Sequence, residues 1–147
     1  MHQIEMVSLN DLVSSSHIYR KFAAIYSFAQ VENRLKKLEK DNPYKGFGML
    51  RLFKCLLLQF IEDLSDRELM RFLEENMLAK WFVGFGLAEI TPEHTVFCKF
   101  RKRLGTKFLS EVFRDLREQL KRQGLMDEVF SFVDASHLIA KASLWEE

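Results

Sequence analysis

The stretch that decides the fold is residues 49–68, MLRLFKCLLLQFIEDLSDRE. Its first part, from Met49 to Leu64, is apolar almost all round, which is typical of a helix buried at the centre of a bundle. Ser65 and Glu68 then stand three residues apart, the spacing of a capping box in which each side chain bonds the other's backbone N–H. The stretch therefore predicts a central helix, a very short turn and a second helix that begins at Asp66.

Helical spacing of apolar residues continues on both sides of this corner. Upstream, it runs through residues 17–40, with an imperfect region at 30–33 where a break would fit, until Pro43 ends it. Downstream, it predicts a short helix over 77–83, one that starts at Thr91-Pro92 and stops at Gly105, and one over 106–122 capped by Gly124. Residues 1–124 are thus predicted to form one helical domain.

The period of the apolar residues changes after residue 124. A β-rich run ends at Asp134, and a second apolar run follows after a turn over residues 135–137, which predicts a β-hairpin over 125–147. Because two strands alone are marginally stable, we expect them to open a larger sheet. The predicted fold class is mainly α, a helical bundle with a helix-turn-helix-like part, followed by this hairpin.

Composition excludes several classes of protein. With 48% hydrophobic and 29% charged residues among 147, the chain is not disordered, and its 14 Phe predict a core of large aromatic side chains. No apolar run reaches the roughly 18 residues of a membrane span. Cys55 and Cys98 lie far apart in helical patterns and are expected to pack as small hydrophobes, which fits a reducing, cytoplasmic setting.

The net charge of +1 conceals an uneven distribution. Residues 99–122 hold nine basic and three acidic side chains, whereas residues 41–98 hold six basic and nine acidic. On the helix that follows Pro92, the i, i+3, i+4 spacing puts Lys99, Lys102 and Arg103 on one face. With Arg101 on its flank, this face suits contact with double-stranded DNA, although a charged face is also what any solvated helix presents.

The residues of this region resemble a known family. LSDREL at 64–69, WFVG at 81–84, TPEHT at 91–95 and FRKRL at 100–104 stand in the order found in the InsH-like N-terminal domain of bacterial insertion-sequence transposases. FVDAS at 132–136 is similar to that family's entry into its catalytic domain, and KASLWEE at 141–147 resembles the sequence shortly after it.

The resemblance implies a function. In that family the helical domain binds the terminal inverted repeats of the mobile element, and a catalytic domain with an RNase H-like fold holds two Mg²⁺ ions with two Asp and one Glu. Asp134 would be the first of these carboxylates, both catalytic and a metal ligand. The candidate DNA contacts are His94, Lys99, Arg101, Lys102, Arg103 and Lys107. His94 is the least distinctive, because a histidine in a first helical turn commonly makes a local hydrogen bond.

The other two carboxylates of the family lie far downstream of its first Asp, and the chain stops at Glu147. We therefore expect a truncated transposase that binds no cofactor and cuts no DNA by itself, with Mg²⁺ used by the full-length family enzyme. The alternative is a helical interaction module that pairs with full-length transposase, or with a second copy of itself, through the unpaired strand edge predicted near Asp134.

Overall fold

The computed structural model describes residues 6–40, 42–122 and 124. These ranges contain eight α-helices and no strand, which confirms the mainly α class. The predicted hairpin and Asp134 lie outside the described residues, and the domain boundary at 124 stays a prediction. The helices are α1 Leu9–Leu12, α2 Ile18–Ile25, α3 Ala29–Glu39, α4 Met49–Glu62, α5 Asp66–Glu75, α6 Met77–Val83, α7 His94–Leu104 and α8 Thr106–Arg122.

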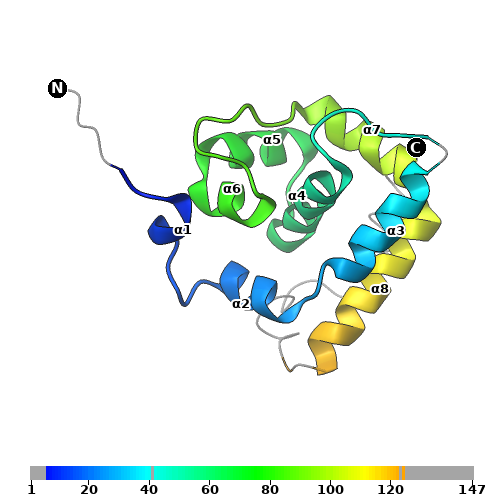
Figure 1. The fold of residues 1–147 in the computed structure, drawn as a ribbon, viewed down its shortest axis with the longest axis horizontal. Helices are drawn as coiled ribbons and strands as arrows, with labels where there is room; N and C mark the ends of the chain where they lie inside the picture. Colours follow the sequence, from blue (N-terminus) through cyan, green and yellow to red (C-terminus); the bar gives the residue numbers. More distant parts are fainter. Residues whose placement is uncertain (1–5, 41, 123, 125–147) are drawn as a thin grey trace.

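Helix α4 is the centre of the bundle, as its sequence predicts. It packs against α3, α5, α6 and α7, which surround it in Figure 1. Ten of its fourteen residues are buried, including Cys55 and the polar Gln59. Phenylalanine rings extend this core into α8. The centre of the Phe113 ring lies 4.1 Å from that of Phe60 in an edge-to-face contact and 6.1 Å from that of Phe53 in a stacked one.

The corner between α4 and α5 has the form that the capping box predicts. Asp63 takes a left-handed conformation (φ 54°, ψ 56°) and ends α4, and α5 begins three residues later at Asp66. Ser65 accepts from the Glu68 N–H at 3.2 Å, while the Glu68 carboxylate accepts from the Ser65 N–H at 3.1 Å. The reciprocal bonds satisfy two backbone donors at the start of α5.

Two predicted boundaries are wrong by a few residues. The upstream break falls at residues 26–28 instead of 30–33. Tyr26 leaves the helical conformation (φ −84°, ψ 120°), and its ring meets that of Phe28 edge to face with the ring centres 4.8 Å apart. Helix α7 starts at His94, not at Pro92: Pro92 is buried and Glu93 remains extended at the N-cap without a side-chain bond.

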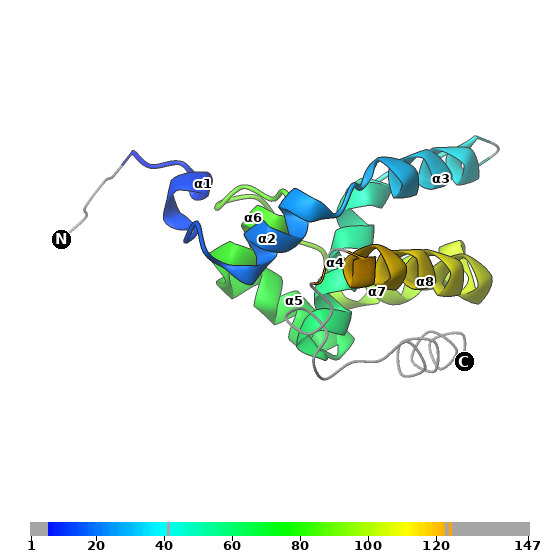
Figure 2. The ribbon, with the colours of Figure 1, turned by 90° about the horizontal axis from the view of Figure 1, so that it is seen from below.

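Helices α3 and α8 lie side by side in both views of the molecule (Figures 1 and 2). Arg34 donates to Asp115 at 2.9 Å and Gln119 to Gln30 at 3.4 Å, so the two helices run in opposite directions. The end of α3 therefore lies near the start of α8. The antiparallel pairing brings the basic residues of these two segments to the same end of the helix pair.

Candidate nucleic-acid interface

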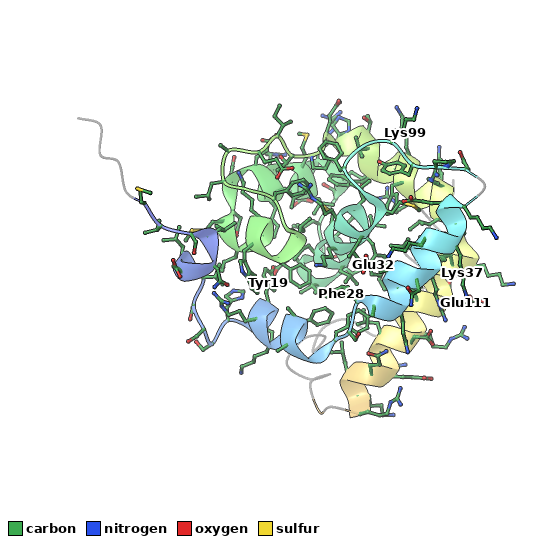
Figure 3. The ribbon with its side chains drawn as sticks, in the orientation of Figure 1. Tyr19, Phe28, Glu32, Lys37, Lys99 and Glu111 are labelled. Carbon is green, nitrogen blue, oxygen red and sulfur yellow. The ribbon has the colours of Figure 1, made fainter. Side chains whose placement is uncertain are left out.

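Helix α7 presents one buried and one exposed side. Phe97, Phe100 and Leu104 are buried against the core, and the side of the helix opposite them carries the exposed residues Thr95, Lys99 and Lys102. We call these three residues the α7 ridge; from Thr95 to Lys102 it extends about 10 Å at 1.5 Å per residue. Lys99 projects from the body of the molecule in Figure 3. The ridge confirms the predicted exposure of Lys99 and Lys102.

Arg101 lies on the opposite side from the ridge and is only 5% exposed. Its Nη1 and Nη2 atoms each donate to one carboxylate oxygen of Asp66 at 2.7 Å, and Nη1 also lies 3.2 Å from Oε1 of Gln59. Asp66 is the first residue of α5, so this two-bond ion pair ties α7 to α5. The prediction that Arg101 flanks a DNA-contacting face is therefore at odds with its position, which suits holding α7 in place.

The contact with Arg101 changes the pKa of the Asp66 carboxyl. Burial by itself would raise its pKa, but the hydrogen bonds from Arg101 and Gln59 and the charge of Arg101 outweigh burial and lower the pKa below its ordinary value. His94, the first residue of α7, adds a smaller lowering effect on the same pKa. Its Nε2 lies 3.8 Å from the Glu93 carboxylate, and its side chain is 25% exposed. His94 is thus a half-buried side chain whose charge acts on Asp66.

Arg103 is half-buried and holds a neighbouring turn. Its guanidinium lies 5.1 Å from the centre of the Tyr44 ring, and its Nη2 donates to the carbonyl oxygen of Asn42. Tyr44 in turn packs 6.1 Å from Phe100 on the buried side of α7. Arg103 therefore joins the turn after α3 to the last part of α7, a role that its place in the basic run did not indicate.

Lys107 stands exposed in the first turn of α8 and continues the basic region beyond Gly105. Farther along, the exposed side of α8 alternates in sign, with Glu111 and Glu118 among its basic residues. The excess charge is accordingly concentrated in residues 99–107, which hold five basic and no acidic side chains. The rest of α8 has the mixed charge of an ordinary solvated face.

Sequence reasoning missed the contribution of the segment that ends α3. Residues 36–45 carry four basic side chains, all exposed, and they lie beside α7 and α8 through the contacts of Arg103 with Asn42 and Tyr44. The sequence signal that could have found this segment is its own excess of basic residues, which lies outside the basic run at 99–122. The residues concerned are Lys36, Lys37, Lys40 and Lys45.

Comparison with known proteins identifies the family. The family model described as "Transposase domain (DUF772)" matches residues 7–103, about two thirds of the chain. The chain belongs to this transposase domain family. Membership indicates a role related to transposition, and it bears out the resemblance read from the motifs between residues 64 and 104. No curated protein and no solved structure matches the chain significantly.

The matched part of this transposase domain includes α1 to α7 apart from the last residue of α7. It thus contains the ridge and the Asp66–Arg101 pair, whereas Lys107 and α8 follow it. Over the described ranges, no cluster of three or more His, Cys, Asp or Glu side chains could hold a metal ion. Asp134, the expected Mg²⁺ ligand, lies outside those ranges, and its role stays a prediction.

Considered over the same described residues, none of the helices combines the length and the apolar character needed to cross a bilayer.

Proposed function

We propose that this transposase domain binds double-stranded DNA, at the terminal inverted repeats of its mobile element, through the α7 ridge. The observation that carries the proposal is the geometry of α7: a helix fixed on one side by Arg101 and the buried aromatic rings, with a polar and doubly basic line on the other. A helix of this kind fits the major groove, which is about 12 Å wide. Thr95 would approach base edges, and Lys99 and Lys102 would bind phosphates or guanines.

The form of the interface would be a variant of helix-turn-helix. The sharp corner lies between α4 and α5, but α7 does not follow it directly, since α6 and residues 84–93 intervene. This order of helices is the predicted one, and the helix-turn-helix-like character stays part of the proposal. The corner places Asp66 at the start of α5, where it holds Arg101. In this proposal α5 supports α7 and α7 enters the groove.

The test measures DNA binding by the full 147-residue chain, with fluorescence anisotropy as the readout at several salt concentrations. The labelled duplex carries the inverted repeat of the element that encodes the chain, and a shuffled duplex measures non-specific binding. The double variant Lys99→Gln, Lys102→Gln should weaken binding to the repeat and lower the salt slope by roughly two, because each neutralised phosphate contributes about 0.9. Thr95→Ala should reduce the difference in affinity between the repeat and the shuffled duplex.

A matched control keeps the charge change and moves it to another surface. Arg67 and Arg71 are exposed on α5, in a segment rich in Glu, and their replacement by Gln should leave binding unchanged. If the wild-type chain binds neither duplex, or if the α5 variant weakens binding as much as the α7 variant, the proposed function is wrong.

A second candidate, an interaction module that pairs with another transposase chain, has one observation in its favour. The loop over residues 84–93 exposes 82% of Ile90 and 50% of Leu87, although it is well fixed. Lys80, itself buried, donates from Nζ to the Leu87 carbonyl at 2.9 Å, and Arg51 forms an ion pair with Glu89. Bare aliphatic side chains on an anchored loop are typical of protein contacts. Co-purification with full-length transposase that Ile90→Ser abolishes would support this function.

A further inference from the structure

Two basic segments that are far apart in the sequence meet at one end of the molecule. Residues 42–44 lie against the last part of α7: Arg103 donates to the Asn42 carbonyl and covers the Tyr44 ring, and Tyr44 packs 6.1 Å from Phe100. The position of the turn is thus set by side chains of α7 itself. Because Arg103 directly follows Lys102 of the ridge, the turn lies beside the last part of α7.

The pairing of α3 with α8 adds the end of α3 to the same region. The bonds Arg34–Asp115 and Gln119–Gln30 fix the helices antiparallel, so the chain direction carries Lys37 toward the start of α8, where Lys107 is exposed. Figure 3 shows Lys37 and Glu111 on the outer side of this helix pair. The end of α3, the following turn and the α7–α8 junction form one continuous region, which we call the basic end.

The basic end holds an excess of positive charge that its own residues do not balance. Residues 36–45 contain four basic and two acidic side chains, and residues 99–107 contain five basic and none acidic. Of these nine basic groups, Arg101 is paired with Asp66, away from the ridge, and Lys36 with Glu32 at 3.7 Å. Bringing like charges together opposes folding, so such a region is typical of a surface that meets a polyanion.

We infer that Lys40 and Lys45, on either side of the turn that Arg103 holds, bind the phosphate backbone of the DNA whose groove receives the α7 ridge. The inference rests on the proposed DNA-binding function and adds a second contact to it. Both side chains are exposed, and a lysine on a flexible stem suits a phosphate, which it meets as a point charge. Contacts to phosphates fix the register of a protein on DNA and carry no sequence information.

The test compares three double variants of the full chain on two labelled duplexes, the inverted repeat and a random sequence, over a range of KCl concentrations. Replacing Lys40 and Lys45 by Gln should weaken binding roughly tenfold on both duplexes alike and lower the salt slope by about two. Replacing Lys99 and Lys102 by Gln should weaken binding to the repeat and lower the salt slope by about two, as the proposed function requires. Replacing Arg67 and Arg71 on α5 is the control, and thermal unfolding confirms that each variant is folded.

The outcomes separate the inference from the function on which it rests. If the Lys40, Lys45 variant binds like the wild type with an unchanged salt slope while the α7 variant is weakened, the inference is wrong and the proposed function stands. The inference also fails if the α5 control loses as much affinity, or if the loss occurs on the repeat alone. If the wild-type chain binds neither duplex, the proposed function fails together with the inference.

Discussion

Arg101 and Asp66, 35 positions apart in the sequence, are joined by two hydrogen bonds of 2.7 Å that fix α7 on the first turn of α5. The arginine is 5% exposed and the side chain of the aspartate 26%, so the pair lies at the margin of the core. Gln59, buried on α4, donates from Nε2 to Oδ1 of Asp66 at 2.8 Å, and this oxygen also accepts from Nη1 of Arg101. Three helices of the transposase domain thus meet at one polar contact, on the side of α7 away from the ridge.

The first prediction concerns the stability that this pair provides. Arg101→Met keeps an apolar stem but leaves Asp66 without its cation, and we expect the free energy of unfolding to fall by about 2–4 kcal/mol, less than for a fully buried pair because Asp66 is partly exposed. Arg101→Lys should recover little of it, since an ammonium cannot reproduce the two parallel bonds. Urea unfolding followed by circular dichroism measures the change.

Lys102→Met is the control for this prediction, because Lys102 is exposed on the same helix and should change stability by no more than about 0.5 kcal/mol. Equal stability of Arg101→Met and the wild type would show that the pair contributes nothing. A selective loss of DNA affinity in a variant that is equally stable would instead return Arg101 to the list of DNA contacts.

The second prediction is the pH dependence of the same contact. The native pKa of Asp66 lies below its ordinary value of 3.8, so its contribution to stability is complete above that pH and is lost as the pH falls through the native pKa. We therefore expect the stability difference between the wild type and Asp66→Asn to be constant from pH 7 to about pH 5 and to shrink toward pH 3. Urea midpoints across this range provide the measurement; a difference that grows in acid would contradict the sign.

How far the sequence could lead is shown by the elements on either side of this contact. The start of α5 could be predicted because Ser65 and Glu68 specify it locally. The bounds of the helices Met77–Val83 and Thr106–Arg122 could also be predicted, because glycines and helical periodicity mark them locally. Local signals of this kind act within one or two helical turns and need no knowledge of the rest of the fold.

The inward position of Arg101 could not be read from its charge, which matches that of its neighbours. Its spacing did contain a signal: Arg101 lies four residues after Phe97 and three before Leu104, on the buried side of the helix. Its partner is distant in the sequence and no local rule connects them. The basic end was missed for a similar reason, since the contact between Arg103 and Asn42 joins segments 61 residues apart.

The third prediction tests Arg103 as the residue that holds the turn after α3. Arg103→Ala removes the hydrogen bond to the Asn42 carbonyl and uncovers the ring of Tyr44, so backbone amides of residues 42–48 should exchange with deuterium faster. Amides in the middle of α4 should be unaffected, because that helix is buried among four others. Hydrogen exchange followed by mass spectrometry resolves the two regions, and unchanged exchange at 42–48 would show that Arg103 does not restrain the turn.

The last prediction concerns the loop that exposes Leu87 and Ile90. Lys80 is 8% exposed, and its Nζ donates to the Leu87 carbonyl at 2.9 Å, which fixes the loop from beneath. Lys80→Met keeps the packing of the stem and removes this bond, so we expect a loss of about 1.5–3 kcal/mol in unfolding free energy, the usual range for a hydrogen bond made by a charged group, and faster exchange of amides 86–90. Lys45→Met, at an exposed lysine, is the matched control and should change neither. If exchange at 86–90 stays at the wild-type rate in Lys80→Met, the ion pair of Arg51 with Glu89 is sufficient to hold the loop, and the Lys80 bond is dispensable.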